Sequence, residues 1–484
     1  MPSNLVVRVR ASSPEIQEGL AAIAAELELP GEFPAEVTAA AERAAADVVL
    51  PDLDRTDIPF LTIDPEGSMD LDQALHIERS GADGYVVHYA IADVAAFVTP
   101  GDPVDLEANK RGETLYGAGT RIPLHPPELS EGAASLLPDQ VRPALLWTIT
   151  LDAEGTPTDV RVERARVRSM ARWSYVDAQK ALDARSAGEP TKGTEVLELL
   201  REVGRLREKQ EVARGGVSLP LPEQEVDETD GGFRLVFRQQ LPVELWNAQI
   251  SLLTGMSAAS LMVEAKVGML RTLPPADPRD VARLRRVAKG LRIDWPEDMD
   301  YPAFIRSLDP SVSQHQAMVV ACTRLLRGSG YAAFDGELPE QTRHSAIAAE
   351  YAHVTAPLRR LGDRYVGEVC LAICAGTPVP DWVSAALPGL PKTLQDSARR
   401  AGAYERAVLD LIEAAILADR VGETFDGVVT SVHENDGRSG VVMLAEVGVE
   451  APVTSAQALP LGEDVRVTLA TADIAARKVA FTLP

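Results

Sequence analysis

The pattern of apolar and polar positions divides the chain into three parts. From residue 51 to about 170, apolar and polar residues alternate in runs bounded by Gly, Pro and Asp, which is typical of β-strands. The clearest runs are FLTID (60–64), GYVVHYAIADV (84–94) and ALLWTITLD (144–152). From Tyr175 onward, apolar residues recur every three or four positions, which predicts helices. Strands followed by helices favour an α+β domain over a doubly wound sheet.

The two ends of the chain differ from this central part. Residues 1–50 hold one short alternating strand, NLVVRVR, and two Ala- and Glu-rich helices, so this region is predicted to be mainly helical. After residue 420, short strands with turn signals return, as in a small closed barrel. We therefore expect three parts, at 1–50, 51–420 and 421–484. The predicted helices cover 14–28, 35–48, 194–213, 243–266, 278–290, 311–327, 343–352, 360–375 and 394–419.

Composition places the chain among ordinary globular proteins. It has 484 residues, 45% of them hydrophobic and 25% charged, which suits two or three domains. No apolar stretch approaches the ~20 residues that span a bilayer, and the start lacks the apolar core of a signal peptide. Three cysteines without CxxC spacing predict neither disulfides nor a zinc site. We expect a cytoplasmic monomer without membrane contact.

The charge balance limits how the chain could bind nucleic acid. There are 48 basic and 72 acidic residues, a net charge of −24, which argues against a general cationic surface for phosphate contacts. Two local stretches are basic, RVERARVRSMAR (161–172) and RDVARLRRVAKGLR (279–292). Such runs can be solvated faces of a strand or a helix, or they can line a local channel for RNA.

An acidic cluster follows the first predicted strand. In TIDPEGSMDLDQAL (62–75), Asp64 ends the strand and Asp70 and Asp72 lie in an extended piece, where residues two apart point the same way. Converging carboxylates need cations, and hard oxygen ligands suit Mg²⁺ or Mn²⁺. A calcium loop fits badly, because no Glu closes it at the twelfth position. The alternative is that Asp, Gly and Ser simply form a turn.

Longer stretches of sequence favour the metal site over the simple turn. The stretch from Tyr89 to Pro138, with TIDPEGSMDLDQAL before it and HSAIAAEYAHVTAPLRRLGDRYVGE (344–368) after it, resembles the catalytic RNB domain of the ribonuclease II and ribonuclease R family. The resemblance implies a mixed β-sheet wrapped by helices over 51–420. It also implies a magnesium-dependent exoribonuclease that degrades single-stranded RNA from the 3′ end and releases nucleoside 5′-monophosphates.

The resemblance assigns roles to individual residues. Asp64, Asp70 and Asp72 take three of the four positions of the family's metal-site aspartates, and the fourth falls on Gln73. An amide cannot supply an anionic ligand, although its carbonyl oxygen can still coordinate a metal or hold a water. Asp70 and Asp72 are expected to be catalytic together with Arg359, which matches the arginine placed against the scissile phosphate.

Further positions match residues that contact RNA. Tyr116 matches the tyrosine that packs against the 3′-terminal nucleotide, and Arg360 is a second basic candidate beside Arg359. Tyr175 and Glu244 resemble the pair that reads the terminal ribose, since contacts to a 2′-hydroxyl distinguish RNA from DNA. Glu244 could instead be a helix-start residue, where a carboxylate is favourable.

Two alternatives remain open. Gln73 supports a catalytically impaired protein of the same fold that acts as an RNA-binding or regulatory module. A nucleotide-sugar transferase built on Asp70-Leu71-Asp72 would leave the two longer blocks unexplained. The start departs from the family, because residues 1–50 do not resemble a cold-shock barrel. The tail at 421–484 resembles the family's OB-type RNA-binding barrel but is acidic, so it is expected to cap the RNA channel or to contact other protein more than it binds RNA.

Overall fold

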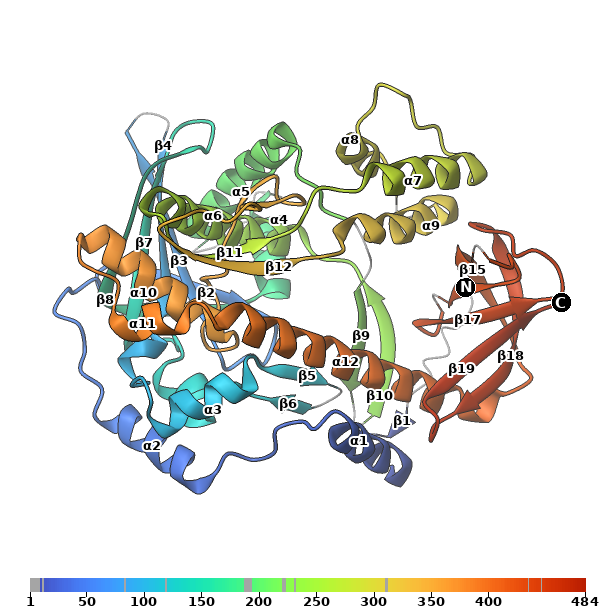
Figure 1. Ribbon diagram of the computed structural model, residues 1–484, viewed down its shortest axis with the longest axis horizontal. Helices are drawn as coiled ribbons and strands as arrows, with labels where there is room; N and C mark the ends of the chain where they lie inside the picture. Colours follow the sequence, from blue (N-terminus) through green and yellow to red (C-terminus); the bar gives the residue numbers. More distant parts are fainter. Residues whose placement is uncertain are drawn as a thin grey trace.

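The computed structural model describes residues 9–10, 13–81, 84–117, 120–186, 194–219, 223–229, 232–309, 312–433, 435–444 and 446–484. Two β-barrels lie at opposite ends of the molecule, and the long helix α12 (Leu390–Leu417) runs between them (Figure 1). Helices surround the first barrel, so the predicted α+β class is confirmed. Within these described ranges, no helix is both long and apolar enough to cross a membrane.

The first barrel forms from the segment predicted to be rich in strands. Its strands are β2 (Phe60–Asp64), β3 (Gln73–Ser80), β4 (Gly84–Ala92), β7 (Val141–Leu151) and β8 (Pro157–Ser174), closed in the order β2-β3-β4-β7-β8. Neighbours are antiparallel except β2 and β8. The 18-residue β8 pairs first with β7 and then with β2, which closes the sheet. The mixed sheet was predicted from sequence, but its closure was not.

Helices cover this barrel with apolar faces. Helix α6 buries Ile250 and Leu253, and α10 buries Val366 and Val369, in the cluster that also holds Trp147 of β7. The surrounding helices are α3 (Pro103–Arg111), α4 (Tyr175–Ser186), α5 (Glu195–Arg214), α6 (Pro242–Ala265), α10 (Leu361–Ala375) and α11 (Asp381–Ala386). A separate apolar cluster joins α7 (Pro278–Gly290), α8 (Tyr301–Arg306) and α9 (Ser313–Cys322).

One predicted helix is wrong. Residues 343–352 form a short hairpin of β13 (Arg343–His344) and β14 (Ala349–Glu350), which packs against the pair β11 (Val267–Thr272) and β12 (Gly330–Asp335). Ala348 has φ 57° in the turn, a left-handed conformation that interrupts a helix. The small apolar residues of this segment match helical spacing, but backbone pairing with β11 determines its structure.

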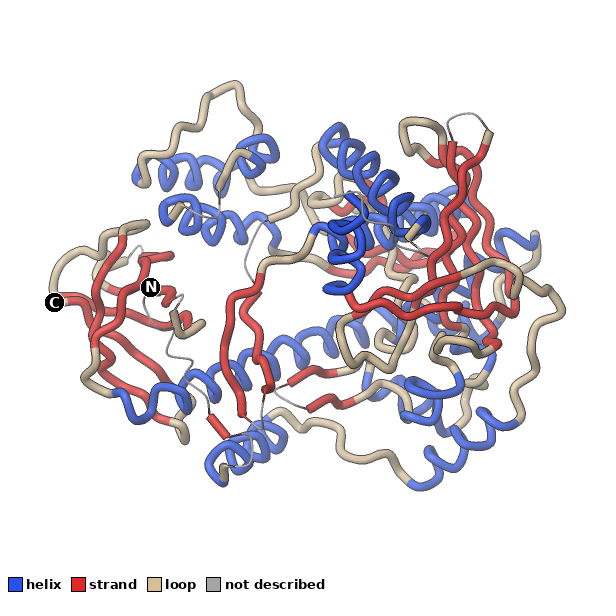
Figure 2. The backbone as a smooth tube through the Cα atoms, turned by 180° about the vertical axis from the view of Figure 1, so that it is seen from behind, coloured by secondary structure: helices blue, strands red, loops and turns tan. Residues whose placement is uncertain are grey.

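The start of the chain is mainly helical, as predicted. Helices α1 (Pro14–Glu26) and α2 (Ala35–Ala46) follow β1 (Val9–Arg10), which extends the sheet of β10 (Gly232–Arg238) and β9 (Glu223–Thr229). The remainder of the predicted first strand, 4–8, lies outside the described residues. Two further short strands, β5 (Leu115–Gly117) and β6 (Thr120–Ile122), form a hairpin beside α12 (Figure 2).

The predicted C-terminal barrel is present and shares its core with other elements. Its strands are β15 (Thr424–Val432), β16 (Ser439–Leu444), β17 (Val449–Ser455), β18 (Asp464–Asp473) and β19 (Lys478–Leu483), of which β17 was not predicted. Phe425 and Phe481 join one apolar cluster with Ile16 of α1 and Leu411 of α12. Gly448 approaches β10 so closely that an added Cβ would lie 2.5 Å from the carbonyl carbon of Leu235. The barrel is thus packed firmly against protein.

Candidate active site

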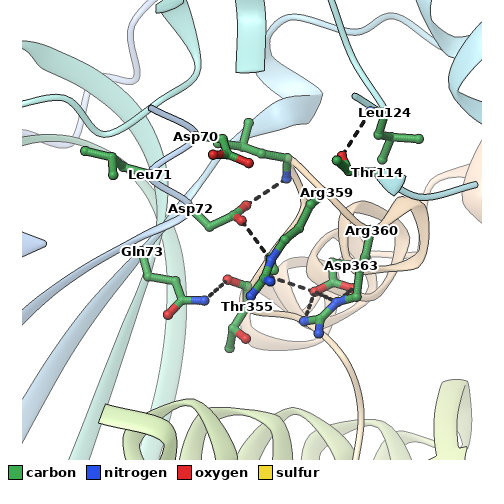
Figure 3. A network of polar contacts seen from close by, with 12 residues as sticks. Asp70, Leu71, Asp72, Gln73, Thr114, Leu124, Thr355, Arg359, Arg360 and Asp363 are labelled. Atoms are coloured by element: carbon green, nitrogen blue, oxygen red, sulfur yellow. Dashed lines mark hydrogen bonds and ion pairs between the residues drawn. The ribbon is translucent and has the colours of Figure 1, made fainter. Parts of the chain in front are cut away.

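Asp70 and Asp72 are carried by a loop that is anchored through the residue between them. Leu71 is fully buried, and its backbone N–H donates to Oγ of Ser135 at 2.9 Å. The same Oγ donates to the carbonyl of Met69 at 2.6 Å. Leu71 is held on one side of the chain, and the two carboxylates project away from it (Figure 3).

At the end of the barrel, Asp72 is buried and Asp64 is half-buried with its Oδ2 atom covered. Asp64 ends β2 opposite Ser174 of β8, and no described residue hydrogen-bonds its buried Oδ2 atom. Burial, reinforced by the negative charge of Asp70, raises the pKa of Asp64 to about 7. Burial likewise raises the pKa of Asp72 to about 8. A nearby cation would stabilise both groups as anions, so their chemistry fits a divalent metal ion.

Asp70 is engaged by an arginine that the sequence did not reveal. Its Oδ1 atom forms a 2.6 Å ion pair with Nη1 of Arg121, which also contacts Glu131. Within the described ranges, no group of three or more His, Cys, Asp or Glu side chains could hold a metal ion. The structure therefore does not gather the three aspartates into one ligand set, because Arg121 draws Asp70 toward the β5–β6 hairpin.

A loop far along the chain brings Arg359 to Asp72. The backbone N–H of Leu358 donates to Oδ1 of Asp72 at 2.8 Å, and Nε of Arg359 lies 3.5 Å from Oδ2 (Figure 3). The Arg359 side chain remains 46% exposed. The arginine therefore lies beside the buried carboxylate and is still accessible to a ligand.

Arg360, unlike Arg359, is paired with Asp363 and not with Asp72. Its Nε and Nη2 atoms donate to Asp363 at 3.1 and 2.7 Å, and Oδ2 of Asp363 also accepts the backbone N–H of Ala356 at 2.8 Å. These contacts fix the shape of the loop that carries Arg359. Because Asp363 engages the Arg360 guanidinium, the structure lends no support to the predicted contact between Arg360 and RNA.

Tyr116 is presented near Asp70 by the β5–β6 hairpin. It lies opposite Arg121 in the strand register, and 48% of the residue is exposed. The next residue, Gly117, lies directly against α12, since an added Cβ would be 2.4 Å from the Tyr404 hydroxyl. Helix α12 thus supports the hairpin while the Tyr116 ring stays available for stacking.

Tyr175 and Glu244 lie in the same neighbourhood. Burial, followed by the negative charges of Asp64 and Glu244, raises the pKa of Tyr175. The Tyr175 hydroxyl accepts a 3.3 Å hydrogen bond from Nδ2 of Asn247. Oε1 of Glu244 accepts the backbone N–H of Leu241 at 3.1 Å and Nη1 of Arg238 at 2.7 Å. Glu244 is therefore a helix-start residue, and it also lies close enough to Tyr175 for its charge to affect the pKa of that group.

The family comparison now decides the relationship. Residues 53–374, more than half of the chain, match the RNB domain, and residues 423–483 match the RNase II-type exonuclease C-terminal S1 domain. This chain belongs to the RNB family of ribonucleases II and R.

The two ribonucleases R compared next are identical to this chain at about a quarter of the aligned positions. Ribonuclease R of Escherichia coli is 26% identical over 412 residues, which cover 78% of this chain and 48% of the relative. Ribonuclease R of Thermotoga maritima is 27% identical over 432 residues, covering 84% and 59%. The chain thus spans roughly half of the length of these relatives.

Solved structures of RNB proteins share the fold. Mycoplasma genitalium RNase R, in complex with ribose methylated single-stranded RNA, has a TM-score of 0.84 at 19% identity, covering 97% of this chain and 78% of its own. Yeast Ssd1, described as a pseudonuclease, has a TM-score of 0.71 at 16% identity, covering 92% and 56%. The fold is therefore found both in a ribonuclease and in a protein described as a pseudonuclease.

Gln73, at the position where the resemblance sets a fourth metal-site aspartate, is held by two hydrogen bonds. Its Nε2 atom donates to the carbonyl oxygen of Thr355 at 2.7 Å, and its Oε1 atom accepts a hydrogen bond from the Tyr89 hydroxyl. Both ends of the amide are thus used within the protein. The predicted role of Gln73 as an oxygen ligand for metal is considered further below.

Sequence reasoning missed the contacts that organise this RNB site. Arg121, Ser135 and Thr355 hold the carboxylate loop and its surroundings, but each acts across 51 or more positions of sequence and carries no motif of its own. Periodicity reports only local structure, so it could not have identified them.

Several arginines of the two basic stretches are paired with acidic residues of the chain. In β8, Arg164 contacts Asp93 and Glu368, and Arg166 contacts Asp54 at 2.9 Å. In α7, Arg279 contacts Asp277 at 2.7 Å. Their use in an RNA channel remains a prediction.

Proposed function

We propose that this chain is a hydrolytic exoribonuclease that degrades single-stranded RNA from the 3′ end and releases nucleoside 5′-monophosphates. The observation that carries the proposal is the position of Arg359 against buried Asp72, with Asp64 and Asp70 beside them, in an RNB fold. An arginine next to a cation-binding carboxylate can offset the charge that builds on a phosphate during hydrolysis. No side chain need act as nucleophile.

The acidic residues would hold Mg²⁺, and Mn²⁺ would also suit these oxygen ligands. Asp64 and Asp72 are the first candidates because burial raises the pKa of each, and Asp70 would join them by leaving Arg121. When bound, the metal would supply an activated water and polarise the scissile phosphate. Arg359 would orient that phosphate, and Tyr175 and Glu244 would hold the terminal ribose.

Addition of Mg²⁺ should stabilise the folded protein even without RNA, because the ion relieves the burial of two carboxylates. At a hundredfold excess over Kd the gain should be about 2.7 kcal/mol. Thermal unfolding followed by calorimetry, with and without Mg²⁺, measures this gain as a rise in Tm. Asp64→Asn should lose most of the rise, whereas Asp54→Asn, at an exposed acid paired with Arg166, should keep it. An equal rise in both variants would contradict a metal site at Asp64.

Substitution of Tyr116 with Ala should weaken RNA binding without abolishing hydrolysis. Stacking of a base on an aromatic ring contributes ~1 to 3 kcal/mol, or roughly 5- to 150-fold in affinity. The measurement is KM for a single-stranded oligonucleotide, together with the length of the final fragment on a gel. Tyr116→Phe is the matched control and should behave as wild type. Loss of kcat without a change in KM would argue against a stacking role.

The second candidate is a catalytically impaired RNA-binding or regulatory module. It is favoured by the ion pair between Asp70 and Arg121 and by Gln73, which replaces an acid of the family site. One assay separates the two candidates: single-stranded RNA labelled at either end is incubated with Mg²⁺ or Mn²⁺. Progressive shortening from the 3′ end with release of monophosphates supports the enzyme. Stable binding without release supports the module and overturns the proposed activity.

A further inference from the structure

Gln73 stands where the resemblance sets the family's fourth metal-site aspartate, and both ends of its amide form hydrogen bonds within the protein. Chemistry fixes the orientation of the Gln73 amide, because the carbonyl of Thr355 can only accept a hydrogen bond and must therefore face the NH₂ group. The Tyr89 hydroxyl then faces Oε1 as a donor. Tyr89 is 1% exposed, and burial raises its pKa well above the usual value, so the hydroxyl keeps its proton.

These contacts connect the carboxylate strand to the arginine loop at two successive residues. Asp72 binds the backbone of Leu358, and Gln73 binds the backbone of Thr355, three residues before it. Thr355 is also held by its side chain, since its Oγ1 atom lies 2.8 Å from Oγ of Ser251 in α6. The loop that ends in Arg359 is thus held by Asp72 and Gln73 on the carboxylate strand and by Ser251 on α6.

We propose that Gln73 is a positioning residue, whose amide holds the Thr355–Arg359 loop against the carboxylate strand, and that it is not a metal ligand. The neighbouring carbonyl requires a donor at this position, which an ionised aspartate cannot supply. An aspartate would instead place negative charge near the Thr355 oxygen and beside buried Asp72. The effects on hydrolysis and on metal affinity rest on the proposed function, but the effect on the loop does not.

Two substitutions give opposite results under the two roles. Gln73→Met keeps the size of the side chain but removes its polar atoms, and Gln73→Asp introduces the family residue. A positioning role predicts that both variants lower kcat by about 10- to 100-fold, since small displacements of a catalytic group are costly. In Gln73→Met the half-saturating Mg²⁺ concentration should stay within twofold of wild type. A metal ligand predicts weaker Mg²⁺ binding in Gln73→Met; that result, or a kcat of Gln73→Asp equal to or above that of wild type, would overturn the proposal.

Hydrogen exchange tests the loop without relying on activity. Amide exchange across 353–363 should speed up at least tenfold in Gln73→Met, whereas it should not change in Gln249→Leu. Gln249 is a matched control, because its buried amide donates to Glu211 at 2.6 Å and not to a carbonyl of this loop. Unchanged exchange in Gln73→Met would overturn the proposal, whereas faster exchange in a protein that never cleaves RNA would overturn only the proposed function.

A double-mutant cycle separates positioning from general loss of stability. If Gln73 acts through Arg359, then Gln73→Met should lower kcat in the wild-type background but by less than twofold in Arg359→Ala. Equal losses in both backgrounds would show that Gln73 does not work through the arginine. Each rate is normalised to the folded fraction measured by circular dichroism.

Discussion

Release of nucleoside monophosphates should fall on the order of a thousandfold when Asp72 is replaced by Asn, a loss of about 4 kcal/mol of transition-state stabilisation. Asn preserves the size of the side chain and can still accept the 2.8 Å hydrogen bond from Leu358. It removes the charge that would bind metal and attract Arg359 at 3.5 Å. The measurement is kcat on end-labelled single-stranded RNA at saturating Mg²⁺.

RNA affinity distinguishes this loss of chemistry from unfolding. The Asp72→Asn protein should bind the same RNA within about fivefold of wild type, because stacking on Tyr116 and other RNA contacts remain. Asp54→Asn, at the exposed acid paired with Arg166, should retain full activity. Hydrolysis by Asp72→Asn at more than a tenth of the wild-type rate would show that Asp72 is not a catalytic residue.

Arg359→Ala should lower kcat by about 100- to 1,000-fold, the range found when a preorganised donor to a transition state is removed. Arg359→Lys should recover only part of this loss, because an ammonium group keeps the charge but lacks the planar fork that binds two phosphate oxygens. Steady-state kinetics on one oligonucleotide compares all three proteins.

The split between kinetic constants is the decisive part of the Arg359 experiment. Because the group is expected to act mainly in the transition state, kcat should fall far more than KM rises. Arg399→Ala is a suitable control, since this arginine is 74% exposed on α12, contacts Asp396 and lies outside both basic stretches. A rise in KM with kcat unchanged would mean that Arg359 only helps to bind RNA.

Much of the architecture could be predicted because its signals are local. Alternation identified β2, β4 and β7, and three- to four-residue spacing identified helices such as α5 and α7 to within one or two residues. Closure of the first barrel depends on β8 pairing with β2, which lies about a hundred residues earlier in the chain. Local patterns do not contain that information, and the same limit produced the incorrect helix at 343–352.

The candidate site was predictable only in part, for the same physical reason. Asp64, Asp70 and Asp72 were found because they are close in sequence, and Arg359 was found only through its family motif. The contact between Asp70 and Arg121 links a loop to a separate hairpin, so the departure from a three-carboxylate ligand set could not be foreseen. The Gln73 contacts with Tyr89 and Thr355 likewise appear only in three dimensions.

Helix α12 connects the distant barrel to the hairpin that carries Tyr116. Its 28 residues would extend about 42 Å at 1.5 Å per residue, and no proline interrupts them after the first turn. In the first part of the helix, Ser397 donates a hydrogen bond to Glu113 at 3.0 Å, and Tyr404 lies against Gly117 of β5. Near the C-terminal end of the helix, Leu411 belongs to the apolar cluster shared with the barrel. Because one continuous helix contacts both parts, a tilt of the C-terminal barrel would displace the hairpin that carries Tyr116.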